Sequence, residues 1–491
     1  MKQAIVIGAG LGGLASASLL AKRGYRVSVF EKNSSEGGKM QQLWSDGYRF
    51  DTGPTLFTMP FLLEKLFSKC GYSLNEYLEY SSLKPLCRYF YSDGVIFDSF
   101  SEREKTLEQI KSFAPEDADA YLHFLKRSEE IYNRTSDAFI YNPLFGIRDI
   151  ARLNVKEFLD IDAFTTVSDK VDEFVSSDYL RMFFKRFATY NGSSPYQAPA
   201  TLNVIPHIEI DQGGYYVNGG MYNIARAMRI LAERMGVTFH FNKGVQSVIT
   251  QNKRATGVLL ETGTEVSCDI LFSNADASET LLNLLPERSV SKSRKEKQKQ
   301  IEPSCSGFVL LLGCQKKWPQ LKHHNIFFSD NYRMEFNEIF EHYMLPSDPT
   351  IYVANTSVTE PDHAPPGSSN LFVLVNAPYL HESQNWGEMV PNYKEKIINI
   401  LENRGLEGLG DSIEFTKTIT PTDFFKLYNS NRGSIYGTSS NNKTAAFARP
   451  RNKFAQMKNV YLVGGSTHPG GGIPLVIQSA FNAVEILGRY T

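Results

Sequence analysis

The stretch AIVIGAGLGGLASASLLAKRGYRVSVFE (residues 4–31) decides the fold of this chain. It begins with the short apolar run AIVIG, which is typical of a buried strand, and continues into a turn with the pattern Gly-x-Gly-x-x-Gly. Helical spacing then extends over residues 14–23, Gly24 ends the helix, and residues 26–31 predict a second strand. The stretch therefore predicts a βαβ unit of a Rossmann-like α/β fold.

The glycines of this turn predict a dinucleotide-binding site. Bare backbone can approach a pyrophosphate, whose charge is stabilised by free amides and by the positive end of the helix. Glu31 ends the second strand, where its carboxylate can accept hydrogen bonds from both hydroxyls of a ribose. The glycine pattern alone also matches structural turns, but strand, helix, second strand and acidic residue together favour a nucleotide. The turn residues assigned to the site are Gly8, Gly10, Gly12 and Gly13.

The composition is that of an ordinary globular protein. The 491 residues are 42% hydrophobic, which is enough for a large core and roughly two or three domains. The 52 basic and 53 acidic residues nearly balance, so charge gives no reason to expect a nucleic-acid partner. The five cysteines form no Cys-x-x-Cys pair, which suits unpaired thiols in a reducing compartment. His323 and His324 lack a third ligand at a matching spacing, so we expect a solvated loop there and no metal site.

Two motifs that follow Glu31 identify the dinucleotide. Gly37-Gly38-Lys39 and YRFDTGPTLF (residues 48–57) resemble flavoproteins of the amine-oxidase and carotenoid-desaturase superfamily, and this resemblance implies FAD. Lys39 can neutralise phosphate or flavin charge, and the turn after Asp51 can direct amides at the flavin edge. Without the resemblance, an exposed lysine and a plain turn explain these residues as well as a cofactor site does. The residues assigned to the cofactor from this region are Lys39, Gly53, Pro54, Thr55 and Leu56.

Later segments complete the expected cofactor site. The resemblance places the backbone of Val245 against adenine and Asn274 nearby; without it, Val245 is an ordinary buried strand residue. The segment KNVYLVGGSTHPGGGIPLVIQSAFNAVEIL (residues 458–487) predicts a strand, a loop and a helix, and its apolar flanks argue against a plain surface loop. Side chains would collide with a flat cofactor that lies on this backbone. The residues assigned here are Gly464, Gly465, Gly471, Gly472 and Ile473.

Essentially the whole chain resembles the FAD-dependent carotenoid desaturases of the phytoene-desaturase type. Within that family, YNGSSPYQAPATLNVIPHIEIDQGGYYVNGGM (residues 190–221) is most similar to the 1-hydroxycarotenoid 3,4-desaturases, also called methoxyneurosporene dehydrogenases. The resemblance implies that a 3,4 double bond is introduced into an acyclic 1-hydroxycarotenoid end by hydride transfer to flavin. The alternatives are a phytoene or diapophytoene (dehydrosqualene) desaturase and a non-enzymatic lipid carrier of the GDP-dissociation-inhibitor type. A flavin amine oxidase, for which nothing in the sequence marks an aromatic cage, and an isomerase that uses reduced flavin also stay open.

The same resemblance implies the domain organisation. It predicts a Rossmann-like FAD-binding domain of the amine-oxidase/GDP-dissociation-inhibitor superfamily with an inserted α+β substrate domain. We assign residues 1–80, 211–286 and 426–491 to the FAD-binding domain, and residues 81–210 and 287–425 to the substrate and membrane-facing domain. Asp149 and Arg152 are considered close to the flavin in this family, but in the sequence they equally form a surface ion pair. No catalytic side chain is therefore assigned.

The electron path and the location of the protein follow from what the sequence lacks. Because no second nucleotide fingerprint is found, we expect the hydride to pass from FAD to an external acceptor such as dioxygen or a quinone. No stretch reaches the roughly 18 apolar residues of a membrane span, and AIVIG fits a strand better than a secretory signal. Residues 139–153 and 177–190 mix apolar and basic side chains as interfacial helices do, although each alone is more typical of a core helix. We expect a cytoplasmic protein that associates peripherally with the inner face of the cell membrane.

Overall fold

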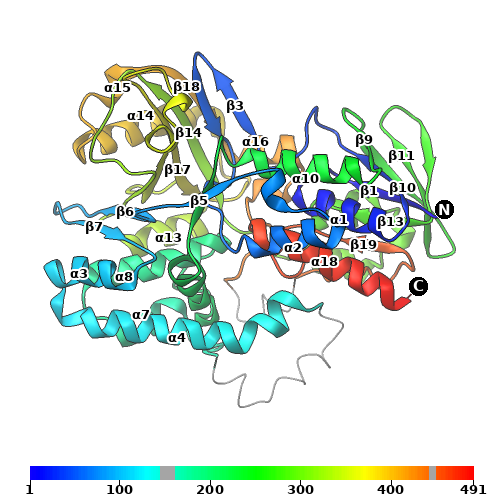
Figure 1. Ribbon diagram of the computed structural model, residues 1–491, viewed down its shortest axis with the longest axis horizontal. Helices are drawn as coiled ribbons and strands as arrows, with labels where there is room; N and C mark the ends of the chain where they lie inside the picture. Colours follow the sequence, from blue (N-terminus) through cyan, green and yellow to red (C-terminus); the bar gives the residue numbers. More distant parts are fainter. Residues whose placement is uncertain (144–160, 442–448, 491) are drawn as a thin grey trace.

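The computed structural model describes residues 1–143, 161–441 and 449–490. Figure 1 shows two bodies, each built on a large sheet, with both chain termini beside the first sheet on the right of the view. Segments from distant parts of the sequence supply both sheets, so the chain passes between the two bodies several times.

The first sheet is parallel and contains the predicted βαβ unit. Its strand order is β19-β13-β1-β2-β9, and every neighbouring pair is parallel. The carboxyl ends of its strands therefore meet at one edge, which is where open α/β sheets bind nucleotides. The strands are β1 (Gln3–Ile7), β2 (Arg26–Phe30), β9 (Thr238–His240), β13 (Ile270–Ser273) and β19 (Val460–Leu462).

Four helices pack together over this sheet. The helix α1 (Leu11–Lys22) contacts α2 (Phe61–Cys70), α10 (Tyr222–Arg234) and α18 (Ile473–Tyr490). It begins at Leu11, inside the glycine turn, so the predicted start at residue 14 is wrong. The carbonyl of Gly10 accepts a hydrogen bond from the amide of Leu14 at 2.9 Å. Tertiary packing buries α1 from Leu11 to Leu20, which outweighs the low helix propensity of its glycines.

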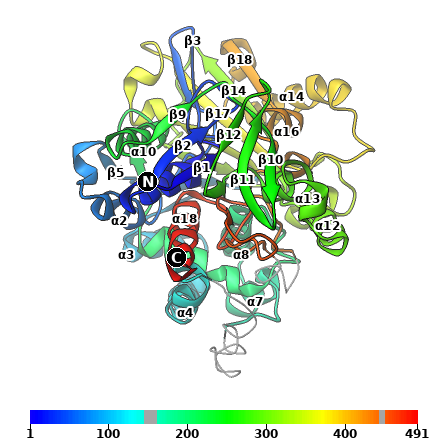
Figure 2. The ribbon, with the colours of Figure 1, turned by 90° about the vertical axis from the view of Figure 1, so that its right-hand side faces the viewer.

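Smaller sheets flank the first one. An antiparallel sheet of β10 (Val245–Gln251), β11 (Arg254–Leu260) and β12 (Glu265–Ser267) lies in front of β1 and β2 in Figure 2. Its residues Val248 and Val258 share a hydrophobic cluster with Ile5 and Leu271 of the first sheet. Two antiparallel strand pairs complete this part: the hairpin of β3 (Gln42–Ser45) with β4 (Tyr48–Asp51), and the pairing of β5 (Tyr80–Ser82) with the distant β8 (Tyr215–Val217).

The second sheet is antiparallel except for one pair. Its order is β18-β14-β17-β16-β15-β6-β7, and only β15 and β6 run parallel. The central strand β14 is buried along its whole length because its side chains alternate between two hydrophobic clusters, with Leu310 and Leu312 in one and Val309 and Leu311 in the other. The strands are β6 (Cys87–Phe90), β7 (Ile96–Ser99), β14 (Ser306–Cys314), β15 (His324–Phe327), β16 (Ile351–Asn355), β17 (Ser369–Ala377) and β18 (Ile413–Ile419).

Helices surround the second sheet. Tyr393, Ile397 and Leu401 of α14 (Trp386–Asn403) pack in the same cluster as Leu310 and Leu312. Figure 1 shows a helical layer below β6 and β7 that contains α3 (Arg103–Phe113), α4 (Ala118–Ser136), α7 (Val167–Phe174) and α8 (Asp178–Lys185). The other α-helices of the described residues are α9 (Val204–Pro206), α11 (Ala277–Glu279), α12 (Lys292–Lys299), α13 (Tyr332–Phe340), α15 (Leu409–Ser412) and α16 (Pro421–Tyr428).

The apolar face of residues 177–190 lies in the protein core. Leu180, Phe183 and Phe184 of α8 are fully buried. The basic residues Lys185 and Arg186 are also more than nine-tenths buried. The expectation that this stretch faces lipid is therefore wrong, because the same helical spacing serves a helix that packs against α4 and β6. The other stretch, residues 139–153, lies largely outside the described residues.

His323 and His324 are buried, so the expected solvated loop is wrong. They are 4% and 3% exposed, and His324 begins β15. Burial, followed by the charge of Arg186, lowers the pKa of His324 to about 3, so this imidazole is neutral at physiological pH. The Nδ1 atom of His323 lies 2.7 Å from the hydroxyl of Thr359.

The proposed domain division remains a prediction. The strands of the first sheet fall within residues 1–80, 211–286 and 426–491, and those of the second sheet fall within 81–210 and 287–425. Within the described ranges, no helix has the length and apolar character needed to cross a bilayer.

Candidate active site

A cavity of about 710 Å³ is lined by residues from both bodies. It contains the carboxyl edge of the first sheet and continues to side chains of the second sheet and its helices. Gly12, Gly13 and Gly464 lie behind this lining. The sequence-predicted residues that do line the cavity are Gly8, Gly10, Glu31, Lys39, Gly53, Pro54, Thr55, Leu56, Val245, Asn274, Gly465, Gly471, Gly472 and Ile473.

Asn274 packs against glycines from both ends of the chain. A Cβ atom on Gly10 would lie 2.6 Å from Nδ2 of Asn274, and one on Gly12 would lie 2.6 Å from its Oδ1. A Cβ atom on Gly464 would lie 2.9 Å from the same oxygen. Because these separations are shorter than Cβ atoms adopt, only glycine fits at the three positions without a shift of Asn274. The glycine turn and the last strand therefore meet around this one side chain.

Gly13 serves the approach of α1 to β1. A Cβ atom on Gly13 would lie only 2.0 Å from the carbonyl oxygen of Gly8, a backbone atom that cannot rotate away. Gly8 itself has φ +89°, which L residues with side chains rarely adopt. The turn thus has the close strand-to-helix contact that places bare amides at the cavity.

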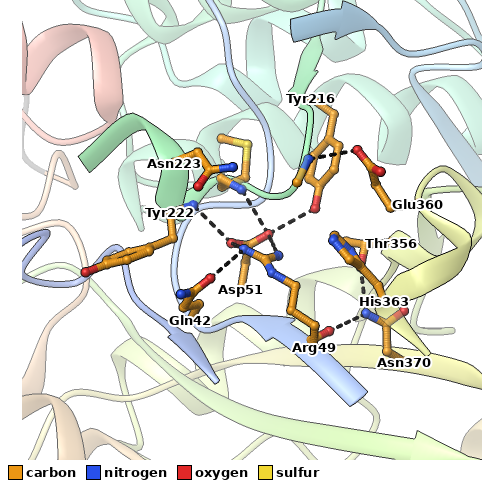
Figure 3. Close-up of polar contacts among 12 residues, drawn as sticks. Gln42, Arg49, Asp51, Tyr216, Tyr222, Asn223, Thr356, Glu360, His363 and Asn370 are labelled. Atoms are coloured by element: carbon orange, nitrogen blue, oxygen red, sulfur yellow. Dashed lines mark hydrogen bonds and ion pairs between the residues drawn. The ribbon is translucent and has the colours of Figure 1, made fainter. Parts of the chain in front are cut away.

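A buried ion pair positions the loop that follows β4, as Figure 3 shows. Both Nη atoms of Arg49 donate to the carboxylate of Asp51, at 2.5 and 2.7 Å, and both side chains are almost fully buried. Asp51 also accepts hydrogen bonds from the hydroxyl of Tyr216 and from the amides of Met221 and Tyr222, each at 3.1 Å. The carboxylate therefore links β4, β8 and the amino end of α10, and it fixes the start of residues 52–56, which line the cavity.

Sequence reasoning assigned Asp51 to a turn and missed Arg49. The glycine at position 220 is the trace that this arginine leaves in the sequence. In the structure, a Cβ atom on Gly220 would lie 1.8 Å from Nη2 of Arg49, so a side chain there would displace the arginine. Glu360 and His363 border this network in Figure 3 and, with Asp362, form the metal-compatible group found among the described residues. Glu360 already accepts the amide of Gly219, and His363 hydrogen-bonds to a threonine, so we assign no metal there.

Comparisons with known proteins agree with this geometry. Residues 11–487 match the model of the family described as flavin containing amine oxidoreductase. The chain belongs to this family. It is 38% identical to a 1-hydroxycarotenoid 3,4-desaturase of Flavobacterium sp. (strain P99-3), over 99% of each chain. It is 35% identical to a 4,4'-diaponeurosporene oxygenase of Staphylococcus aureus, over 97% of this chain and 96% of the relative. An oxidoreductase structure from Methanosarcina mazei has a TM-score of 0.67 at 17% identity, covering 98% of this chain and all of that one.

The protein is thus a flavin-dependent oxidoreductase with FAD as its cofactor, and the residues at the cavity fit that group. Glu31 is 6% exposed; its Oε2 accepts the amide of Ala9 at 2.8 Å, and its Oε1 accepts the amide of Asn33 at 2.9 Å. Each carboxylate oxygen keeps a further lone pair for a ribose hydroxyl. The contact with Ala9 also ties Glu31 to the glycine turn.

Lys39 provides a positive charge beside the glycine turn. Its Nζ donates to the carbonyls of Ser434 and Ile435, at 2.9 and 2.7 Å, which leaves one N–H for an anionic group. Burial lowers the pKa of Lys39 to about 8, and the charge of Asp276 opposes this effect. A bound phosphate or flavin anion would favour the protonated form further.

Arg449 is a second cation that fits an anionic cofactor. Its Nη1 is buried and has no hydrogen-bond partner among the described residues, and a Cβ atom on Gly470 would lie 2.9 Å from it. Burial lowers the pKa of this guanidinium to about 10. Its Nη2 donates to the hydroxyl of Ser440 at 3.1 Å, and no countercharge faces it within the part of the chain that the structure describes. Such a buried cation is costly unless an anionic ligand balances it. This site was not found from the sequence, because nothing near residue 449 forms a motif.

The cavity changes character beyond the cofactor residues. Its lining there is mostly apolar and comes from the helical layer and from the second sheet, which suits a long hydrocarbon. Asp149 and Arg152 lie outside the described residues. The roles given to individual residues toward FAD, including the adenine contact of Val245, stay predictions. The apolar lining residues are Leu86, Phe139, Ile140, Ile161, Leu202, Val204, Ile205, Ile208, Val309, Ile326, Phe372 and Leu374.

Proposed function

We propose that this protein desaturates a carotenoid, introducing a 3,4 double bond into the acyclic end of a 1-hydroxycarotenoid. The observation that carries the proposal is that the glycine-rich cofactor edge and an apolar lining meet in one cavity. The 38% identical relative with this named activity, aligned over 99% of both chains, supports the choice of substrate. The stretch of residues 190–221, which resembles that branch, supplies several of the lining side chains.

The chemistry requires alignment more than side-chain catalysis. Removing two hydrogens from a CH₂–CH₂ unit beside a polyene is aided because the conjugated chain delocalises the developing cation. When bound, FAD would supply the two-electron acceptor for a hydride from one of the two carbons. The neighbouring carbon loses its proton, and the electron pair of that C–H bond becomes the new double bond. The apolar walls hold the chain against the cofactor edge and exclude water from the reacting carbons.

Reduced flavin has to be reoxidised outside this chain. We found no second nucleotide fingerprint in the sequence, so the proposed acceptor is dioxygen or a quinone rather than a nicotinamide. A quinone would reach the protein from the lipid phase, as the carotenoid would.

We propose that the protein associates peripherally with the inner face of the cell membrane. Phe61 of α2 is 40% exposed, and its ring lies 6.4 Å from that of Tyr141, close to the cavity-lining residues Met59 and Ile140. The exposed side chains of Lys65 and Lys69 follow on the same helix. An aromatic residue with adjacent lysines suits contact with an anionic bilayer, from which an apolar substrate would enter.

The deciding experiment supplies defined carotenoids in lipid vesicles to the purified flavoprotein. We expect a 1-hydroxycarotenoid to lose two hydrogen atoms, with lengthening of the polyene in the absorption spectrum and without added NADPH. Equal turnover of phytoene or a diapophytoene would instead support the general desaturase alternative. A product that gains oxygen would indicate the activity named for the Staphylococcus relative. A colourless protein that binds lipid without flavin would indicate a carrier.

A further inference from the structure

An ion pair lies in the wall of the cavity beyond the cofactor residues, where apolar side chains predominate. Arg186 donates to the carboxylate of Glu209, the hydroxyl of Tyr190 donates to the other carboxylate oxygen, and all three residues line the cavity. The side chains of Arg186 and Glu209 are 7% and 2% exposed. A wall for a pure hydrocarbon needs no such group, and apolar residues of similar volume often give equal or greater stability than a buried pair.

Aromatic rings hold the arginine in place. Its guanidinium carbon lies 4.1 Å from the ring centre of Phe187 and 5.2 Å from that of Tyr89. Arg186 and Tyr190 belong to one short helical segment (Arg186–Asn191), and Glu209 belongs to a later one (His207–Asp211). Tyr190 and Glu209 fall within residues 190–221, the part of the sequence most similar to the hydroxycarotenoid branch. The carboxylate therefore sits in a rigid frame, and its two oxygens retain lone pairs after their contacts with Arg186 and Tyr190.

A separate chain of polar side chains extends from the cofactor loop into the same cavity. The hydroxyl of Tyr352 lies 2.6 Å from that of Thr55 and 2.6 Å from Nδ1 of His324, and these three residues also line the cavity. The charges of Glu209 and Arg186 both act on Tyr352, and burial, followed by the charge of Glu209, raises the pKa of Tyr190 well above its ordinary value. The ion pair thus lies within electrostatic reach of the loop that is expected to face the flavin, and the phenols remain protonated.

This position matches the chemistry of the proposed reaction. In a 1-hydroxycarotenoid the hydroxyl is on C1, two bonds from C3, one of the two carbons that lose hydrogen. A group that recognises this hydroxyl must therefore lie close to the reacting carbons, and not at the distant end of the cavity. A polar group far from the cofactor loop could not serve.

We propose that the carboxylate of Glu209, held by Arg186 and Tyr190, accepts a hydrogen bond from the hydroxyl of the substrate and so selects hydroxylated carotenoids. The inference rests on the proposed function, and it goes further by naming the residues that set the specificity. A carboxylate acceptor gives a charge-assisted hydrogen bond to the one polar group of the substrate. A deoxy analogue leaves the acceptor facing a methyl group, which disfavours its binding.

The test compares variants by their preference for the hydroxylated substrate over its deoxy counterpart, as the ratio of the two kcat/KM values. Tyr190→Phe and Tyr121→Phe form a matched pair, because both remove one phenol oxygen from the same body. Tyr121 is fully buried in α4 and lines no part of the cavity. Glu209→Gln removes the charge. The double variant Arg186→Met, Glu209→Met removes the whole pair without leaving a lone buried charge.

We expect the preference to fall roughly 10- to 100-fold in Glu209→Gln and in the double variant, and less in Tyr190→Phe. Tyr121→Phe should keep the wild-type ratio. Binding of the 3,4-desaturated hydroxylated product can be measured without turnover, by the quenching of flavin fluorescence. Its affinity should weaken most in Glu209→Gln and the double variant, less in Tyr190→Phe, and not in Tyr121→Phe. If Glu209→Gln does not fold with FAD, the double variant decides the question.

The possible failures are distinguishable. An unchanged preference in both the double variant and Tyr190→Phe overturns the role of this cluster while the proposed function stands. A wild-type protein that converts no 1-hydroxycarotenoid, or accepts the deoxy analogue equally well, overturns the proposed function, and this inference fails with it.

Discussion

Replacing Gly10 by valine should abolish retention of FAD while the fold survives. The first atom of the new side chain would lie 2.6 Å from Nδ2 of Asn274, so either Asn274 or the turn must shift. Overpacking of this kind costs about 1–3 kcal/mol of stability. The remaining valine atoms would occupy the cavity where bare amides of the turn face the expected pyrophosphate.

The loss of affinity follows from the hydrogen bonds that the turn can no longer make. Hydrogen bonds to a charged group contribute about 1.5–3 kcal/mol each. Losing two of them weakens FAD binding by roughly 10²- to 10⁴-fold, because every 1.4 kcal/mol is a factor of ten. A protein that normally copurifies with its flavin would then be isolated without colour.

The assay measures FAD released on denaturation per mole of purified protein, together with the thermal unfolding midpoint of each apoprotein. Gly387→Ala is the matched control, because Gly387 lies exposed near the start of α14 with its nearest contact at an ordinary 3.5 Å. The control should keep all of its FAD and gain about 0.5–1 kcal/mol of stability. A folded Gly10→Val protein with undiminished FAD would refute the placement of the cofactor.

Three further predictions test other parts of the site. The pKa of Lys39 is lowered from 10.5 to about 8, so the cost of burying its charge destabilises the fold below pH 8 and disappears above pH 10.5. The lysine of the apoprotein loses its positive charge as the pH rises through 8, and its attraction for the anionic cofactor is lost with it, so FAD affinity should fall. Titrating apoprotein with FAD at several pH values should show this fall in the wild type and not in Lys39→Met. Asp51→Asn leaves the guanidinium of Arg49 buried without its countercharge, and denaturant unfolding should reveal a loss of about 3–5 kcal/mol; a loss below about 1 kcal/mol would contradict the role of this pair. Phe61→Asp should reduce flotation with anionic liposomes at low salt, and a wild type that does not float at all would disprove membrane attachment.

The sequence by itself determined the local elements and the position of the cofactor edge. The strand β1, the glycine turn, β2 and the strand-to-helix passage into α18 follow from hydrophobic periodicity and glycine spacing, which are properties of neighbouring residues. Because parallel strands bring their carboxyl ends to one edge, the glycines of residues 8–13 and of residues 464–472 could be expected at the same ligand.

Only the tertiary structure decided what each amphipathic segment faces and which distant side chains meet. The spacing of Phe183 and Phe184 is the same for a lipid surface and for a core, and only the helices packed around α8 distinguish the two. The pairing of Arg186 with Glu209 and the packing of Asn274 against Gly464 join residues from different elements, so no local pattern reports them. Their energies depend on burial, which is a property of the assembled chain, and that is why the residues proposed to set the substrate preference could be identified only from the fold.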